Sequence, residues 1–476
     1  MSVRVGEAAH APAFPKAAKR LLENAQLRRN VRRATDTIRA KRAKVVAEMA
    51  DWQELRAAAH EIKEHTLRYL DFYLERFEAN CTRAGGQVHW ARDADEANRI
   101  AIGLIQARGQ REVIKVKTMT SDETGLNRAL EAAGITPHET DLADMIVQLG
   151  EDKPSHIVVP ALHRNRSEIR EIFLRKMKLA ELSDRPEDLT GAARGYLREK
   201  FLRVKAGFSG ANFAIAETGS ICVVESEGNG RMCVTLPEIL ITMLGVEKVI
   251  PTFRDLEVFL QLLPRSATGE RMNPYNSIWT GVSAGDGPRE FHVILLDNNR
   301  TAVLADAESR ETLDCIRCGA CLNACPVYRQ TGGHAYGSIY SGPIGAILSP
   351  QLQSMDHSKS LPYASSLCGA CYEVCPVKIN IPEILIHLRA KLVESGYPPL
   401  VERAAMKVAS VAFSGADSLA AAQGLARLCQ WPFEHDGQLR NLPGLLGGWT
   451  DFRDLAAIPK ESFRDWWSKR TGGQDE

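Results

Sequence analysis

Cysteine spacing near residue 320 constrains this chain more than any other feature of its sequence. Four cysteines follow one another as C-x2-C-x2-C-x3-C, with Pro326 directly after the fourth; they are Cys315, Cys318, Cys321 and Cys325. Three of them share one short loop, and the fourth begins a segment whose direction Pro326 restricts. The pattern is typical of a run that binds a [4Fe–4S] cluster and lends its fourth cysteine to a neighbouring cluster.

A second cysteine run repeats the first. The ten residues CGACLNACPV at 318–327 recur as CGACYEVCPV at 368–377, with seven of the ten identical at an offset of 50. Such a repeat is expected of a two-cluster ferredoxin-type module, in which the fourth cysteine of each run ligates the other cluster. We therefore predict a first cluster held by Cys315, Cys318, Cys321 and Cys375, and a second held by Cys325, Cys368 and Cys371.

The second predicted ligand set is one thiolate short. Ser365 stands three residues before Cys368, where a fourth cysteine would lie. Three outcomes are open: a [3Fe–4S] cluster, a [4Fe–4S] cluster with an oxygen ligand such as Ser365, or one iron open to solvent or substrate. Zinc is disfavoured because structural zinc sites pair two C-x2–4-C arms. The other cysteines stand alone among apolar neighbours and are predicted to be small buried side chains; they are Cys81, Cys222, Cys233 and Cys429.

Charge and hydropathy narrow the functional classes. Sixty Lys and Arg against 59 Asp and Glu give a net charge of +1, which argues against a nucleic-acid binder. The chain has no run of 18 apolar residues and no apolar signal core at its start, so we expect no transmembrane segment and a cytoplasmic location. Residues 28–44 carry eight basic residues and one acid. They predict a solvated helix face, with peripheral contact to an acidic partner or to anionic lipid as the alternative.

The remaining pattern predicts four regions. Residues 1–75 read as helical, 76–305 as an α/β domain, 306–395 as an α-helical two-cluster module, and 396–476 as a helical C-terminal segment. The α/β domain is predicted from alternating elements. Strands are expected at 111–117, 156–162, 213–217, 220–226 and 292–298, with helices at 94–108, 122–133, 188–204 and 236–244 and a hairpin turn at Thr218-Gly219.

A few side chains outside the cysteine runs are candidates for a role. Glu217 is a candidate carboxylate nucleophile or base, although a local hydrogen bond is the simpler interpretation. Arg317 and Asn323, beside and within the first run, are candidates for tuning a cluster, although ordinary surface positions are favoured. Trp466 and Trp467 are predicted to lie on a packed C-terminal helix.

At this point the chain resembles the lactate utilization protein B family, bacterial iron–sulfur proteins of L-lactate oxidation. The resemblance spans nearly the whole chain and is carried by both cysteine runs and by TMTSDETGLNRALE (118–131), VQLGEDKPSHIVVPALHRNR (147–166), GANFAIAETGSICVVESEGNGR (210–231), PRSATGERMNPYNSIWTG (264–281) and HAYGSIYSGPIGAIL (334–348). It implies that the α/β part is a LUD domain, akin to the sugar-isomerase and CoA-transferase superfamily.

The resemblance also implies the two ligand sets given above, and the lack of a cysteine at 365 belongs to the family pattern. It implies two companion subunits, one a cysteine-rich redox protein and one a short LUD protein. The leading hypothesis is therefore an iron–sulfur electron-transfer subunit of a multi-subunit L-lactate oxidation system, with an electron acceptor that the sequence does not identify. The alternative is a stand-alone enzyme that uses an open iron or a LUD-domain carboxylate on a hydroxy acid or acyl substrate.

Overall fold

The computed structural model describes residues 12–450 and 453–471. The chain divides into two compact units, Met1–Lys391 and Leu392–Glu476. The four region boundaries predicted from the sequence are finer than this division and stay a prediction. Among the described residues, no helix is both long and apolar enough to cross a membrane.

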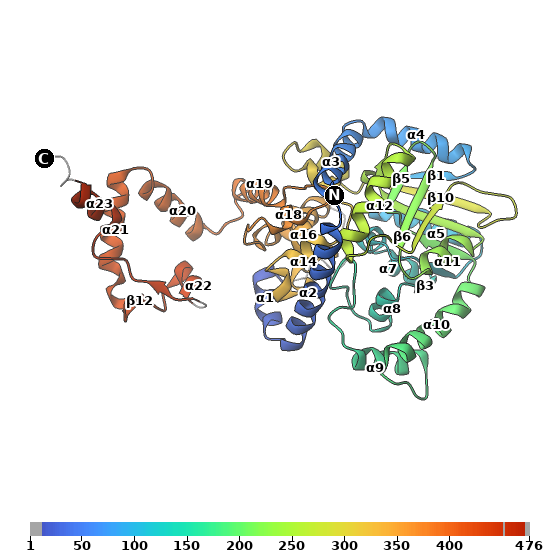
Figure 1. The fold of residues 1–476 in the computed structure, drawn as a ribbon, viewed down its shortest axis with the longest axis horizontal. Helices are drawn as coiled ribbons and strands as arrows, with labels where there is room; N and C mark the ends of the chain where they lie inside the picture. Colours follow the sequence, from blue (N-terminus) through green and yellow to red (C-terminus); the bar gives the residue numbers. More distant parts are fainter. Residues whose placement is uncertain (1–11, 451–452, 472–476) are drawn as a thin grey trace. The chain divides into compact units, whose positions relative to one another are not determined.

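A six-stranded parallel sheet forms the centre of the first unit (Figure 1). Its strands, in spatial order, are β1 (Gln87–Ala91), β10 (Glu290–Leu296), β7 (Ile239–Gly245), β4 (Ala206–Ser209), β2 (Glu112–Lys115) and β3 (Thr136–Glu139). Adjacent residues on β2, β7 and β10 enter different apolar cores, as Val113 and Ile114 do on β2. The sheet is therefore buried on both faces, as a parallel sheet requires. The helices of this domain are α5 (Ala94–Ala107), α6 (Met119–Thr124), α7 (Leu126–Ala132), α8 (Leu142–Leu149), α9 (Arg166–Met177), α10 (Pro186–Arg203), α11 (Asn229–Thr235), η2 (Val246–Lys248), α12 (Phe253–Ala267) and α13 (Arg300–Ala305).

A second sheet of four strands carries the predicted hairpin. Its order is β8 (Val249–Ile250), β5 (Phe213–Ile215), β6 (Ser220–Glu225) and β9 (Tyr275–Trp279). β5 and β6 pair antiparallel around the turn at Thr218-Gly219, as predicted. Gly219 has a φ of 70°, and a Cβ there would lie 2.1 Å from the backbone nitrogen of Cys81, so the turn requires glycine.

Two predicted elements of the α/β domain are wrong. Residues 236–244 contain the buried strand β7 rather than a helix, because a strand covered on both faces reads as a continuous apolar run. Residues 156–162 form an irregular loop rather than a strand. There, Nδ1 of His156 accepts hydrogen bonds from the backbone N–H groups of Val158 and Val159 at 3.0 and 3.1 Å. These N–H groups therefore do not pair with a neighbouring strand. The predicted helix at 122–133 is divided by Gly125, whose φ is 68°.

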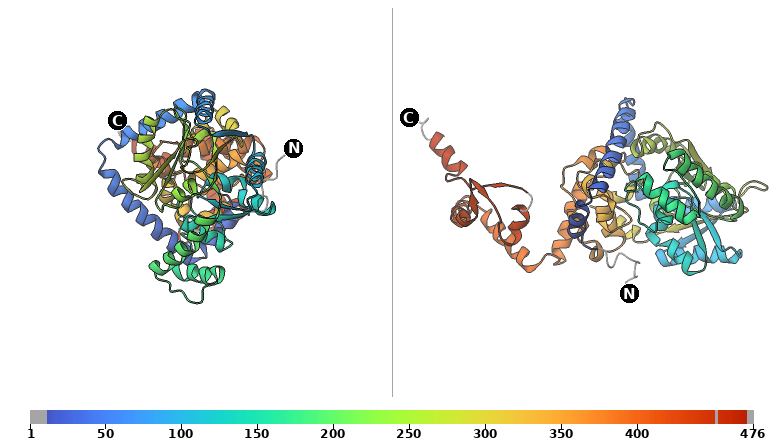
Figure 2. Two further views of the ribbon diagram at one scale, coloured as in Figure 1. Left: turned by 90° about the vertical axis from the view of Figure 1, so that its right-hand side faces the viewer. Right: turned by 90° about the horizontal axis from the view of Figure 1, so that it is seen from below.

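Four helices precede the first strand, in agreement with the predicted helical N-terminus. They are α1 (Phe14–Leu22), α2 (Ala25–Ala47), α3 (Trp52–Arg68) and α4 (Leu70–Arg83). α2 packs against α12 of the α/β domain and also against α14 (Ala320–Ala324) and α15 (Tyr328–Thr331) of the cysteine-bearing region, and α3 packs against α12 and η3 (Arg310–Asp314) (Figures 1 and 2). The N-terminal helices therefore bridge the two parts of the first unit.

The cysteine module (residues 310–391) completes the first unit with short helices. These are η3 (Arg310–Asp314), α14 (Ala320–Ala324), α15 (Tyr328–Thr331), η4 (Gly333–Tyr336), α16 (Gly342–Leu352), α17 (Met355–Ser358), η5 (Leu361–Tyr363), α18 (Ala370–Val374) and α19 (Ile381–Glu394). Its apolar interior includes five of the seven clustered cysteines together with Ile316, Ile344 and Ile379.

The second unit is mainly helical, as predicted, with a small antiparallel sheet. Its elements are α20 (Leu400–Ala412), α21 (Ala416–Gln430), η6 (Trp431–Phe433), β11 (Glu434–His435), β12 (Gln438–Leu439), η7 (Gly444–Leu446), α22 (Gly447–Thr450), β13 (Leu455–Ala456) and α23 (Phe463–Thr471). Two expectations fail here. Cys429 is exposed rather than buried, and Trp466 and Trp467 contact one another while remaining 42% and 50% exposed. By contrast, Cys81, Cys222 and Cys233 are buried, as predicted.

Candidate metal centre

The two cysteine runs fold alike. Each has a left-handed glycine, Gly319 with φ 75° or Gly369 with φ 81°, followed by a five-residue helix, α14 or α18. Each helix ends at a cysteine with extended backbone, Cys325 or Cys375, after which the proline redirects the chain. α14 and α18 pack against each other. The sequence repeat is thus a structural repeat, arranged face to face.

The repeat extends upstream to Ser365. Arg317 and Leu367 occupy equivalent positions and share the left-handed backbone, with φ of 61° and 54°. The N–H of Arg317 donates to Sγ of Cys315 at 3.4 Å, and the N–H of Leu367 donates to Oγ of Ser365 at 3.1 Å. Ser365 therefore occupies, in the second loop, the place that Cys315 has in the first.

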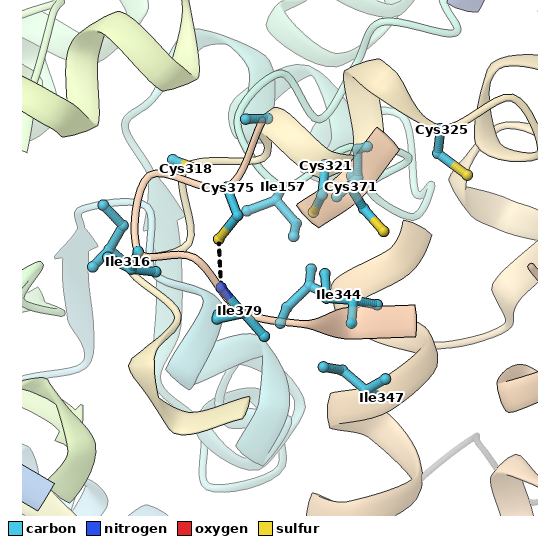
Figure 3. Packing of buried hydrophobic residues seen from close by; sticks show 14 of the residues in the cluster. Ile157, Ile316, Cys318, Cys321, Cys325, Ile344, Ile347, Cys371, Cys375 and Ile379 are labelled. Carbon is cyan, nitrogen blue, oxygen red and sulfur yellow. Dashed lines mark hydrogen bonds between the residues drawn. The ribbon is translucent and has the colours of Figure 1, made fainter. Parts of the chain in front are cut away.

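The seven clustered thiols fall into two groups, according to which thiols lie near one another. Burial raises the pKa of Cys321, and the nearby thiols that raise it further belong to Cys318, Cys315, Cys371 and Cys375. Burial also raises the pKa of Cys371 to about 12, with Cys325 and Cys368 as its neighbouring thiols. In Figure 3, Cys321 and Cys371 lie side by side, with Cys318 and Cys375 on one side and Cys325 on the other. The thiols thus form two groups that meet at Cys321 and Cys371.

The two groups of thiols differ in burial. Burial raises the pKa of Cys318 to about 12 and also raises that of Cys375. Cys315 is half-buried and Cys368 is exposed, so the second group reaches solvent more directly than the first.

Basic side chains from three segments surround the first group. Arg56 of α3 donates from Nε to the carbonyl of Cys375 at 2.8 Å and from Nη2 to that of Tyr372 at 3.0 Å. Arg42 of α2 donates from Nη2 to the carbonyl of Val374 at 3.0 Å. Arg317, in the loop between Cys315 and Cys318, is buried and lies 4.9 Å from the ring of Tyr340.

The seven clustered cysteines form a cage, and buried hydrogen-bond donors around this cage lack partners among the residues that the structure describes. An iron–sulfur cluster in the cage would supply acceptors for them. Among the buried polar atoms that have no hydrogen-bond partner in the described part of the chain, four lie near the cysteines: Nε of Arg42, Nη1 of Arg317, Nδ2 of Asn323 and Oη of Tyr336. Buried donors are rarely left unsatisfied in native proteins. The sulfides of a cluster accept hydrogen bonds, and such bonds help to set its potential. The residues present therefore fit an iron–sulfur group in both ligand type and surrounding donors.

A buried ionic network joins the cysteine module to the α/β domain. Arg300 donates from Nη1 and Nη2 to the two carboxylate oxygens of Glu123, both at 2.9 Å, and from Nε to Glu247 at 2.5 Å. The cysteine module adds Tyr340, whose hydroxyl donates to Glu123 at 2.6 Å, and Arg317, which contacts Glu247 at 3.3 Å. Arg300 and Glu247 follow the carboxyl ends of β10 and β7, the edge at which parallel sheets commonly place their sites.

The structure changes the interpretation of two side chains singled out from sequence, Arg317 and Asn323, and agrees with the simpler interpretation of a third, Glu217. Arg317 and Asn323 are buried at the cage rather than on the surface. Nε2 of His156, in the loop wrongly predicted as a strand, lies 3.2 Å from Oδ1 of Asn323. Glu217 is exposed, and its Oε2 accepts a hydrogen bond from the N–H of Phe253 at the start of α12. Its carboxylate thus has the local structural bond that the simpler interpretation expected.

Sequence reasoning missed Arg42, Arg56 and His156 as neighbours of the cage. Arg42 lies within the basic stretch at 28–44, which was predicted to be a solvated face. Arg39, on the same helix, is 49% exposed, whereas the side chain of Arg42 reaches the second cysteine run. No local pattern separates these two arginines, because the partner of Arg42 lies 332 residues away.

Comparison with known proteins finds matches over most of the chain. Family models match residues 74–296 as a LUD domain, 311–379 as a 4Fe-4S dicluster domain, and 389–472 as the C-terminal part of lactate utilisation protein B. Lactate utilization protein B of Bacillus licheniformis is 43% identical over 454 residues, covering 94% of this chain and 95% of that protein. Its counterpart in Bacillus subtilis is 42% identical over 475 residues, covering 99% of this chain and 98% of that protein.

The chain belongs to the lactate utilization protein B family. This membership confirms the resemblance drawn from the motifs and the predicted fold class, a LUD domain with a helical N-terminus, a ferredoxin-type module and a mainly helical C-terminal region. The dicluster match at 311–379 supports iron–sulfur binding by the cysteine module.

Proposed function

We propose that this protein is an iron–sulfur electron-transfer subunit of an L-lactate oxidation system. The ligands of the first cluster are Cys315, Cys318, Cys321 and Cys375, and those of the second are Cys325, Cys368 and Cys371, with Ser365 at the vacant fourth position. The observation that carries the proposal is the arrangement of the clustered cysteines, in which Cys321 and Cys371 lie side by side, with Cys318 and Cys375 on one side and Cys325 on the other (Figure 3). The names of the relatives, lactate utilization protein B, support the link to lactate.

Two adjacent clusters suit this role because lactate oxidation to pyruvate releases two electrons and two protons. When bound, the clusters supply one-electron carriers that can divide the electron pair. The protein's own residues hold the carriers in a fixed pair, since α14 and α18 pack together, and Ile316, Ile344 and Ile379 line the apolar interior around the thiols. The oxidation of the hydroxy acid and the onward transfer of its electrons are assigned to companion subunits, a cysteine-rich redox protein and a short LUD protein.

Cluster content tests the ligand assignment. The protein purified without oxygen should be brown and contain iron and acid-labile sulfide for two clusters. Cys318→Ser and Cys371→Ser should each lower the iron content and should each remove a different electron paramagnetic resonance (EPR) signal. The exposed Cys429→Ser is the matched control and should change neither. A colourless, folded, zinc-loaded wild type would overturn the assignment.

Turnover tests the subunit role against the alternative of a stand-alone enzyme. The isolated protein should not reduce an artificial acceptor with L-lactate, and addition of the two companion subunits should produce that activity. Robust lactate oxidation by the isolated chain would contradict the relay and favour catalysis at an open iron or at a LUD-domain carboxylate.

A further inference from the structure

The N-terminal helices have contacts with the cysteine cage that no family model covers. The matched domains begin at residue 74, yet α2 and α3 each place a guanidinium against the second cysteine run. Arg56 is 7% exposed and binds the carbonyls of Tyr372 and Cys375. Arg42 binds the carbonyl of Val374. These are the last carbonyls of α18 and of the cysteine that follows it.

The helix end alone does not account for this arrangement. A helix C-terminus favours nearby cations, and two arginines from different helices converge on this five-residue helix. Nε of Arg42 is buried and has no hydrogen-bond partner among the described residues. Both guanidinium groups lie close enough to Cys375 for a charge interaction with its thiol, and that of Arg42 also lies close enough to the thiol of Cys318. Their positive charge is therefore directed at the first ligand set.

The second ligand set has a different surrounding. Cys368 is exposed, and the neighbouring charge that acts on Cys325 is the thiol of Cys368. Arg389 is the arginine on this side, and it donates to the carbonyls of Pro362 and Ser365 at 2.9 and 3.4 Å. The two sets thus differ in both solvent access and the number of arginines directed at them.

We propose that Arg42 and Arg56 raise the reduction potential of the first cluster relative to the second, which makes the N-terminal helices part of the redox centre. The inference rests on the two-cluster relay proposed above. Reduction adds one negative charge, and a cation in a buried, low-dielectric site stabilises the reduced state more than it would in water. Burial of the first set acts in the opposite direction, because it disfavours the more highly charged state. Replacing a charge while preserving burial separates the two effects.

The test is an EPR-monitored redox titration of the full-length protein with dithionite as the reductant. Arg42→Gln and Arg56→Gln remove one charge each at nearly constant size. Each should shift the midpoint of the first cluster to lower potential by a tenfold change in the reduced-to-oxidised ratio, about 59 mV for one electron. The midpoint of the second cluster should shift less. Arg42→Lys and Arg56→Lys should recover most of the shift.

Arg39→Gln is the matched control, because Arg39 lies on the same helix as Arg42 but is 49% exposed and pairs with Asp36. It should leave both midpoints unchanged. An unchanged first midpoint in Arg42→Gln, or an equal shift of both clusters, would overturn the inference. If Arg56→Gln loses its clusters, Arg42→Gln decides, since its side chain is only half-buried. A wild type without two clusters would instead overturn the proposed function.

Discussion

Tyr340→Phe should weaken the junction between the LUD domain and the cysteine module. Its hydroxyl donates to Oε2 of Glu123 at 2.6 Å, and Tyr340 is 1% exposed. A hydrogen bond to a charged group contributes about 1.5–3 kcal/mol to stability. Phenylalanine keeps the ring beside Arg317, and Glu123 keeps its two bonds to Arg300. The expected loss in the free energy of unfolding is therefore about 2 kcal/mol, without collapse of the network.

Urea unfolding under anaerobic conditions measures this loss, followed by cluster absorbance and by tryptophan fluorescence. Both probes should shift to lower urea together, because the bond joins the cysteine module to the LUD domain. Combining Tyr340→Phe with Glu123→Gln should cost less than the sum of the two single changes. Tyr69→Phe, at a tyrosine that is 48% exposed, is the control and should change little. A loss of unfolding free energy below about 0.5 kcal/mol, or strict additivity of the two changes, would contradict the expected coupling between Tyr340 and Glu123.

Two further results are expected. Ser365→Cys should keep the second site as a [4Fe–4S] cluster in air, whereas the wild type should convert to a [3Fe–4S] cluster. The reason is that a serine hydroxyl is far less acidic than a cysteine thiol, whose pKa is about 8.5. Identical EPR spectra of the two proteins after oxidation would contradict this. Burial favours a raised pKa for Glu247, but Arg300 and Arg317 outweigh it and lower the pKa from 4.5 to about 2. The stability that this carboxylate contributes, about 3 kcal/mol, should be fully present above pH 4.5 and lost as pH falls towards 2; a Glu247→Gln variant with the same acid-unfolding curve as the wild type would argue against it.

Local structure was the part of the site most accessible from the sequence. The spacing of the first run and its repeat predicted two matching loops, and the structure contains them, including equivalent left-handed glycines at Gly319 and Gly369. Such geometry depends on residues within one short segment. The alignment of the two runs predicted that Ser365 takes the position equivalent to Cys315. The two loops have the same backbone hydrogen bond at these positions.

Features that depend on long-range packing were not accessible. The strand at 239–245 and the loop at 156–162 are both apolar runs, and the choice between helix, strand and loop depended on what covers them and on the ring of His156. The burial of Arg317 likewise depends on Glu247 and Tyr340, which come from distant parts of the chain. Periodicity reports the faces of one element and carries no information about such partners.

The bridging position of α2 and α3 has a consequence for how the protein is made. Arg56 is bonded to residues 316 and 319 positions later, and the partner of Arg42 lies 332 positions later. At about 5–20 residues per second, translation needs on the order of 15 to 60 s to produce those partners. The first helices to leave the ribosome are thus among the last to complete their contacts.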